Sequence, residues 1–350
     1  MKMKNIFLNF LRNLNPETSH HISILSLKYL SGFLEKNYKS EILNTNFGNL
    51  NFANPIGLAA GYDKNAEVID SLFKIGFGFV ECGTVTPVAQ YGNTKPRIFR
   101  LKEDKGIINR LGFNNCGIDQ FSKNFNQRNF NLGIAGVNIG PNKESNNFID
   151  DYLNLFNSVY EYADYVTLNV SSPNTKNLRS IQRTEDLSVL TYEINSLRES
   201  KGSHKKIVLK VDPDCTKKEY SKIINIIQKN KIDGLIVANT TLSRPEFLKS
   251  DFKNEEGGLS GAPIKEKSNK ILRFISKETQ GEVTLIGVGG ISSAKDAYEK
   301  IKIGASLVQL YSSLTFNNLG FINQINKDLS SYLRKDGFTN IKEAIGIEIR

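Results

Sequence analysis

The stretch that decides the fold is YVTLNVSSPNT, residues 165–175. Its first four residues, Tyr165 to Leu168, are apolar or β-branched without a polar alternation, which is typical of a strand covered on both faces. Polar and turn-forming residues follow at once, from Asn169 onward. The stretch therefore indicates a buried parallel strand whose carboxyl end carries amide and hydroxyl side chains.

The same pattern recurs along the chain, with amphipathic helical segments between the strands. Three such segments are residues 150–163, residues 216–231 with Thr216 as a helix cap, and residues 293–304, which close on Gly304. Eight strand–helix units predict a (β/α)8 TIM barrel, with a doubly wound parallel sheet as the structural alternative. The eight apolar runs cover residues 55–59, 77–82, 133–139, 165–168, 207–211, 234–238, 284–288 and 307–310.

Each run is followed by polar or turn-forming residues that are unusual in a hydrophobic core, as in AAGYDKN, CGTVTP, NIGPNK, KVDPD and NTTLSR. Active sites of such barrels lie at the carboxyl ends of the strands. Lys64 and Lys210 stand at two of these ends, where burial would neutralise them without an anionic partner. Together with a set of amides they suit a planar, anionic ligand that is rich in hydrogen bonds. The amides are Asn109, Asn138, Asn169, Asn174 and Asn239.

Glycine-rich ends follow the last two runs, in GVGGISS and QLYSS, and GGLSG at 257–261 offers a third glycine-rich loop. Barrels often bind phosphate after strands 7 and 8, at free N–H groups near helix starts. No Walker A pattern occurs, which argues against a nucleotide triphosphate. The sequence therefore predicts a phosphate site at this part of the barrel mouth.

Two stretches lie outside the repeat. Residues 84–115 contain an expected hairpin around KEDKG, and long insertions at a barrel mouth are usually functional. Residues 1–45 form two expected amphipathic helices joined by NPETSH. They would either cap the barrel or bind a membrane surface or lipophile, with basic residues such as Arg12 and Lys28 near anionic lipid. We expect residues 1–45 to form this helical segment and residues 46–350 to form the barrel domain.

Composition limits the remaining classes. The 350 residues are 39% hydrophobic and 23% charged, enough for a sizeable core. Three distant cysteines without a CxxC pattern indicate a reduced cytosolic protein, and with three histidines no metal site is expected. The net charge of +10 favours an acidic partner, although a solvated lysine-rich surface explains it equally well. Neither a signal peptide nor a membrane span of 18 apolar residues is found in the sequence.

Ten motifs occur in the order and spacing of the dihydroorotate dehydrogenases, flavin enzymes of pyrimidine synthesis, and the chain resembles this family over nearly its whole length. The motifs are NPIGLAAGYDKN, GFGFVECGTVTP, KPRIFRL, INRLGFNN, VNIGPNK, NVSSPNT, ANTTLSRP, GGLSG, IGVGGI and GASLVQLYSS. The resemblance implies an FMN-binding (β/α)8 barrel. Class 1 enzymes of the family are soluble and use a Cys base, whereas class 2 enzymes are membrane-associated, use a Ser and reduce quinone.

Ser172 and the N-terminal segment resemble class 2. The resemblance then implies oxidation of (S)-dihydroorotate to orotate, with FMN as hydride acceptor and quinone as the final acceptor. It also implies a monomer without a nucleic-acid partner, held peripherally on the cytoplasmic face of the inner membrane if the source is bacterial. Ser172 would be the catalytic base that takes a proton from C5 while C6 gives hydride to FMN. A serine hydroxyl is a weak base, so a relay through Thr175 and water is expected.

The remaining roles follow from the resemblance, motif by motif. Substrate-binding positions are Lys64, Asn109, Arg110, Leu111, Gly112, Phe113, Asn169, Asn174, Asn239 and Thr240. Cofactor-binding positions are Ala60, Gly61, Tyr62, Asp63, Lys64, Thr84, Asn138, Asn169, Lys210, Ala238, Gly261, Gly290, Tyr311 and Ser312. His20 and Arg100 match positions that line the quinone end of the class 2 tunnel.

Three positions depart from the family pattern. Ala238 stands where a Thr is common, Pro141 is unusual, and Asp212 could compete for the charge of Lys210. Three alternatives also stay open. A class 1 enzyme is disfavoured because position 172 is not a Cys. A tRNA dihydrouridine synthase would explain the positive charge but needs a catalytic Cys on a mobile loop, for which Cys116 is the only loose candidate. A non-enzymatic membrane-bound relative would be expected to have lost Ser172 or Lys64.

Overall fold

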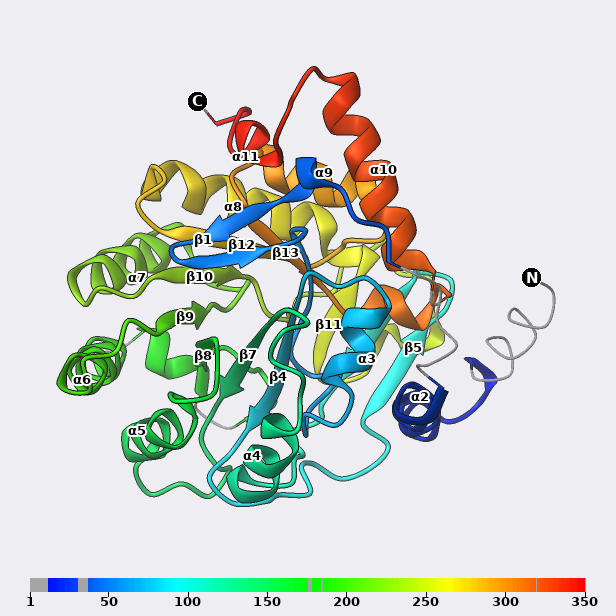
Figure 1. Ribbon diagram of the computed structural model, residues 1–350. Helices are drawn as coiled ribbons and strands as arrows, with labels where there is room; N and C mark the ends of the chain where they lie inside the picture. The colour runs from blue at the N-terminus through cyan, green and yellow to red at the C-terminus, as the bar shows by residue number, and fades with distance from the viewer. Residues whose placement is uncertain (1–11, 31–36, 176–177, 184, 319, 350) are drawn as a thin grey trace.

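The computed structural model describes residues 12–30, 37–175, 178–183, 185–318 and 320–349. Its centre is a closed barrel of eight parallel strands, ringed by helices (Figure 1). The barrel closes where β13 pairs with β3, with Leu310 opposite Leu58. This closure confirms the predicted (β/α)8 barrel and excludes the doubly wound sheet. In barrel order from the first strand, the strands are β3 Ile56–Leu58, β4 Phe79–Val85, β7 Ile134–Ile139, β8 Tyr165–Asn169, β9 Lys206–Lys210, β10 Gly234–Val237, β12 Thr284–Val288 and β13 Leu307–Leu310.

All eight predicted apolar runs form these strands, and the predicted helices lie between them. Thr216 and Glu219 make a capping box at the start of α7, and Ser293 caps α9. The α-helices are α2 Pro16–Leu30, α3 Ile69–Lys74, α4 Ile118–Asn126, α5 Phe148–Val159, α6 Asp186–Ser200, α7 Lys217–Lys229, α8 Lys265–Thr279, α9 Ala294–Lys302, α10 Phe321–Lys335 and α11 Ile341–Ala344. Short 3-10 helices are η2 Glu41–Leu43, η3 Leu178–Arg183, η4 Asp251–Asn254, η5 Ala262–Ile264 and η6 Ser312–Thr315.

Aromatic rings fill the amino end of the barrel. Phe79 and Tyr165 lie inside it with ring centroids 6.5 Å apart, and Phe52 contacts Phe79 at 5.4 Å. Phe52 comes from a hairpin of β1, Thr45–Phe47, and β2, Leu50–Phe52, which the sequence analysis did not predict. A Cβ atom at Gly57 would lie 2.2 Å from the ring of Phe79, so glycine is what makes room for that ring. The amino end is therefore a packed core.

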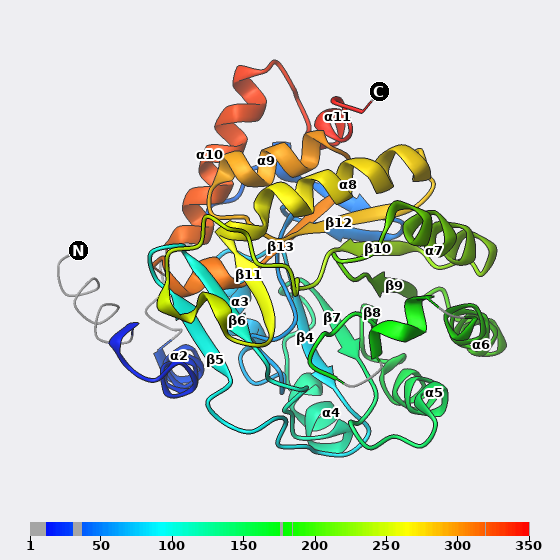
Figure 2. The same cartoon turned by 180° about the vertical axis from the view of Figure 1, so that it is seen from behind.

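A three-stranded antiparallel sheet lies over the other end (Figure 2). Strands β5, Ile98–Leu101, and β6, Gly106–Asn109, form the predicted hairpin. The segment expected to be a glycine-rich loop is instead a strand, β11, Gly258–Gly261, paired with β6. The loop prediction was wrong because these glycines permit close packing: a Cβ at Gly258 would lie 1.9 Å from Thr240 Oγ1.

Helix α2 packs beside β5 and α3 (Figure 1). Ile24 and Leu27 are buried, and the Leu27 carbonyl accepts a hydrogen bond from Ser71 at 2.8 Å. The first of the two predicted N-terminal helices, and residues 31–36, lie outside the described residues. The two-helix extension and the boundary at residue 45 therefore stay predictions. Within the described ranges, every helix is too short or too polar to cross a bilayer.

Candidate active site

A cavity of about 1020 Å³ opens at the carboxyl end of the barrel and extends to α2. Most of the residues predicted for substrate, cofactor and quinone line this one space, although they come from distant parts of the sequence. The lining residues among them are His20, Ala60, Gly61, Tyr62, Lys64, Thr84, Arg100, Asn109, Leu111, Gly112, Phe113, Asn169, Ser172, Asn174, Lys210, Ala238, Asn239, Thr240, Gly261, Gly290, Tyr311 and Ser312.

Two lysines give the cavity positive charge. Lys210, at the end of β9, is buried, and its ammonium donates to no acceptor among the described residues. Burial lowers the pKa of Lys210, and the carboxylate of Glu81 opposes that shift. Burial also lowers the pKa of Lys64 to about 8, with the charge of Glu17 opposing it. Both lysines would gain stability from an anionic ligand in the cavity.

Below the cavity, a chain of hydrogen bonds fixes the orientation of the amides. The Glu81 carboxylate is fully buried and accepts from Asn138 Nδ2 at 2.8 Å. Asn138 Oδ1 then accepts from Thr84 at 2.6 Å and from Asn169 Nδ2 at 3.1 Å. This leaves Asn169 Oδ1 for Asn239 Nδ2, at 3.4 Å. Because a carboxylate only accepts, Glu81 sets which way each amide in the series points.

Ser172 lies on the loop that follows β8, and its side chain lines the cavity. Its Oγ accepts the Asn174 backbone N–H at 3.3 Å, and Asn174 Nδ2 donates to Asn109 at 3.2 Å. The Thr175 hydroxyl is buried without a hydrogen-bond partner among the described residues. Such a group needs water or a ligand, as the predicted relay requires.

At the other end of the cavity, the backbone turns sharply after β12. Gly289 and Gly290 have φ of 102° and 77°, which favours glycine. The N–H groups of Gly290 and Ile291 donate to no acceptor in the described part of the chain. Ser312 lies close by, with its hydroxyl 2.8 Å from that of Ser260. Free backbone N–H groups beside hydroxyls are suited to a phosphate.

An aromatic wall joins this region to α2. Tyr62 contacts His20 at 5.1 Å and Tyr311 at 5.7 Å between ring centroids, in edge-on geometry. Burial lowers the pKa of His20 to about 3, so the imidazole is neutral at physiological pH. Arg100 donates to the backbone carbonyls of residues 12 and 14, at 3.0 and 2.8 Å, which ties the hairpin to the entry of α2. The three rings of the wall are therefore neutral, with the Arg100 guanidinium beside them.

Three predicted site residues lie outside the cavity lining. The Arg110 side chain turns to Glu255, at 2.8 Å, and stacks on Phe99. Asp63 is buried and accepts the backbone N–H groups of Glu67 and Val68 at 2.8 and 2.9 Å. Asn138 lies behind Thr84 and Asn169, as described above. Asn138 holds Thr84 and Asn169, which face the cavity, whereas Asp63 fixes the loop that follows β3.

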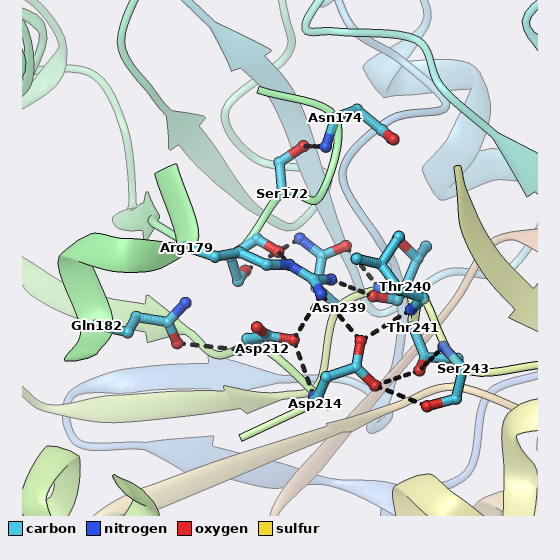
Figure 3. A network of polar contacts seen from close by, with 12 residues as sticks. Ser172, Asn174, Arg179, Gln182, Asp212, Asp214, Asn239, Thr240, Thr241 and Ser243 are labelled. Carbon is cyan, nitrogen blue, oxygen red and sulfur yellow. Dashed lines mark hydrogen bonds and ion pairs between the residues drawn. The ribbon is translucent and has the colours of Figure 1, made fainter. Parts of the chain in front are cut away.

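Asp212 does not compete for Lys210. It pairs with Arg179 at 3.0 Å, and Arg179 also binds Asp214 at 2.9 Å (Figure 3). Sequence analysis missed Arg179, Glu81 and Gln309, whose Nε2 donates to Glu81 at 3.0 Å. A charged residue within an apolar run was the available signal for Glu81. The role of Arg179 had no sequence signal, because its partners lie on other loops.

Fold and site together define a (β/α)8-barrel enzyme whose carboxyl-end cavity is built for an anionic ligand. A model of the dihydroorotate dehydrogenase family matches residues 42–333. The chain belongs to this flavin-dependent family and, within it, to class 2, the quinone-dependent enzymes.

Relatives and solved structures agree with this placement. The chain is 42% identical over 359 aligned residues to dihydroorotate dehydrogenase (quinone) of Xanthobacter autotrophicus, covering 100% of both chains. It is 44% identical to the enzyme of the same name in Bartonella tribocorum, covering 94% of this chain and 92% of the relative. A crystal structure of the Eimeria tenella enzyme with ferulenol has 37% identity and a TM-score of 0.92, covering 98% of this chain and 99% of that one.

Proposed function

We propose that this chain oxidises (S)-dihydroorotate to orotate in pyrimidine biosynthesis, with FMN as its cofactor and a quinone as the final electron acceptor. One observation carries the proposal. A single cavity brings together Ser172 with its amides, Lys210 with the free backbone N–H groups at Gly290, and His20 of α2. An acid–base group, a flavin cradle and a lipophile entrance are what this two-substrate reaction needs.

The residues present fit FMN. The N–H groups of Gly290 and Ile291, with Ser312, would hold the phosphate, and the buried ammonium of Lys210, which has no acceptor among the described residues, would lie by the ring system. Lys210 supplies positive charge in a site of low dielectric, where it stabilises developing negative charge more strongly than in water. When bound, FMN supplies the hydride-accepting chemistry of the reaction.

Substrate binding and proton removal fall to other residues of the chain. Lys64 binds the carboxylate of dihydroorotate, and the amides of Asn109, Asn174 and Asn239 orient its ring. Ser172 Oγ takes the C5 proton. Ser172 Oγ accepts the Asn174 N–H at one lone pair and donates to no acceptor among the described residues, which leaves its second lone pair for the C5 proton and its own hydrogen for the relay. Thr175, buried without a described partner, accepts it through water, and this relay makes a weak base effective.

Helix α2 supports access for a membrane-borne quinone. Leu25, Lys28 and Tyr29 are all exposed, and their spacing places them on one face of α2. Apolar residues beside a cation suit the surface of an anionic bilayer. We propose that the chain acts as a peripherally bound monomer on the cytoplasmic membrane face, with His20 and Arg100 at the quinone end of the cavity.

The positions of the cysteines do not support a class 1 enzyme or a tRNA dihydrouridine synthase, the two alternatives that need a catalytic cysteine. Among the described residues that line the cavity there is no cysteine, and burial raises the pKa of both Cys82 and Cys116. The test is dihydroorotate oxidation by the purified protein with a ubiquinone analogue, fumarate or NAD as acceptor. We expect turnover when the quinone is the acceptor, and none when fumarate or NAD is the acceptor. Turnover with fumarate or NAD alone would indicate class 1, and no oxidation with any acceptor would refute the proposal.

A further inference from the structure

The loop that carries Ser172 is fastened to its neighbours by the side chain of Arg179, in η3 (Figure 3). Only 11% of this side chain is exposed. Its Nε donates to the Ser171 carbonyl at 3.0 Å, and its Nη2 donates to the Thr240 carbonyl at 2.6 Å. Its Nη1 binds the carboxylates of Asp212 and Asp214. One planar group thus connects the loops that follow β8, β9 and β10, three neighbouring strands.

The two carbonyls belong to residues next to the proposed chemistry. The Ser171 carbonyl is part of the peptide bond that leads into Ser172. The Thr240 carbonyl comes one residue after Asn239, whose side chain lines the cavity and donates to Ser171 Oγ at 3.0 Å. Arg179 therefore sets the orientation of the peptide plane at Ser172 relative to the loop of Asn239.

The acidic partners of Arg179 are themselves held in place. Asp212 is fully buried, and its Oδ1 accepts the Asp214 backbone N–H at 2.8 Å. Asp214 also binds Lys267 and accepts from Thr241. Burial acts to raise the pKa of Asp214, but the hydrogen bonds from Lys267, Thr241 and other donors hold that pKa well below its ordinary range. The Asp214 carboxylate is therefore held in its ionised form, and in this clamp, made of Arg179, Lys267, Asp212 and Asp214, two cations meet two acidic residues.

Gln182 supplies a second link from the same 3-10 helix. Its Nε2 donates to the Val170 carbonyl at 2.8 Å, and its Oε1 accepts the Asp212 N–H at 3.0 Å. The backbone on the amino side of Ser172 is thus held at two successive carbonyls, those of Val170 and Ser171. A lysine at 179 would keep the positive charge but could not reach two carbonyls and two carboxylates in one plane.

We propose that Arg179 is a positioning residue for the reaction: it holds the Ser172 loop against the Asn239–Thr240 loop and so aims the base at the substrate. This inference rests on the proposed function, in which Ser172 removes the proton. A misplacement of about 1 Å at a reacting group can cost about 10²-fold in rate. The clamp is therefore expected to act on turnover more than on binding.

Arg198 is a matched control. It is also buried, pairs with Asp233, and donates to two backbone carbonyls, those of Lys205 and Lys231, at 3.2 and 2.8 Å. Its partners precede β9 and β10, at the opposite end of the barrel from the cavity. Truncation of either arginine removes a similar set of bonds, but only Arg179 touches the Ser172 loop.

The experiment compares Arg179→Ala, Arg179→Lys and Arg198→Ala in the full-length flavin-loaded protein. We expect kcat to fall about 10²-fold in Arg179→Ala, whereas orotate affinity changes less than about tenfold. Arg198→Ala should lower the melting temperature but keep kcat within about threefold of wild type. Arg179→Lys should have a melting temperature near that of the wild type but a kcat as low as that of Arg179→Ala. Added guanidinium should restore part of the kcat of Arg179→Ala and should not raise that of the other two variants.

Amide hydrogen exchange of residues 170–175 gives a readout that does not depend on the reaction. It should rise in Arg179→Ala and stay at the wild-type rate in Arg198→Ala. Unchanged exchange, or a kcat loss of equal size in both alanine variants, would overturn the inference. A wild-type protein that fails to oxidise dihydroorotate would refute the proposed function instead, and the exchange result would still decide whether Arg179 holds the loop.

Discussion

At the amino end of the barrel, Arg198 and Asp233 bind each other and the backbone of neighbouring strands, whereas at the carboxyl end two buried polar side chains, those of Lys210 and Thr175, differ from this pair. The Asp233 carboxylate also accepts the Ile207 N–H at 3.0 Å, and Asp164 accepts the Ala135 N–H at 2.7 Å in the same way. Within the part of the chain that the structure describes, Lys210 and Thr175 at the carboxyl end have no such partners. A buried polar group without a partner costs free energy, so a ligand or water at Lys210 and Thr175 would complete bonds that Arg198 and Asp233 already have.

The largest expected effect at the carboxyl end is that of Ser172→Ala. Loss of the hydroxyl should lower dihydroorotate-dependent flavin reduction by about 10²–10⁴-fold, because positioned proton transfer contributes about that much. Stopped-flow absorbance of the flavin measures it. The melting temperature should change little, since from the described residues Ser172 Oγ accepts one long hydrogen bond, of 3.3 Å.

Ser122→Ala is the control for Ser172. Ser122 lies on α4, outside the cavity lining, and its hydroxyl donates to the Ile118 carbonyl at 2.8 Å. This variant should reduce its flavin at the wild-type rate. Near-normal flavin reduction in Ser172→Ala would show that this hydroxyl at the carboxyl end is not needed for the reaction.

At the amino end, Arg198→Ala should lower the free energy of unfolding by about 3 kcal/mol, the lower end of the cost of breaking a buried ion pair. The lower end applies because Lys206 still pairs with Asp233 at 2.8 Å. Urea denaturation with a constant m-value measures the change. A loss of activity without a loss of stability in this variant would show that the two ends are not separate in function.

The pH dependence of substrate binding tests Lys64. Burial lowers its pKa to about 8, so the protonated form is lost as the pH rises through that value. An anionic substrate binds the protonated form better and raises its pKa. We therefore expect KM for dihydroorotate to rise above pH 8 by up to about tenfold per pH unit. In Lys64→Met, KM should be high and should no longer rise in this way, and a rise that persisted would assign the titration to another group.

The smallest expected effect comes from a polar group at the carboxyl end that has its partners. Thr216 Oγ1 accepts the Glu219 N–H at 3.3 Å, and Glu219 accepts the Thr216 N–H at 2.6 Å. Thr216→Ala should cost about 1 kcal/mol of stability, because a helix cap is lost, and should leave kcat unchanged. Thermal unfolding and steady-state kinetics test both parts. A changed kcat would mean that polar groups at the carboxyl end affect the reaction because of where they lie, even when they have hydrogen-bond partners.

The sequence by itself determined the periodic elements and the local chemistry. Buried strands appear as continuous apolar runs, and caps such as Thr216 and turns such as Gly289–Gly290 depend on neighbouring residues. For this reason the eight strands, the KEDKG hairpin and the placement of Ser172 after β8 were predictable. The β1–β2 hairpin and strand β11 were not, because their residues, TNF, LNF and GLSG, form no continuous apolar run, and β11 is glycine-rich.

Only the tertiary structure decided which polar groups meet. Asp212 lies two residues from Lys210 in the sequence, yet it pairs with Arg179, which is 33 positions away. Strand β9 ends at Lys210, so the alternation of the strand does not extend to Asp212, and the loop turns Asp212 toward η3 while Lys210 faces the cavity. Arg110 turns to Glu255 for a similar reason, since β6 brings it against the segment before β11. Closure of the barrel brings distant loops into contact, and that contact determines which charges are neutralised and which are left for a ligand.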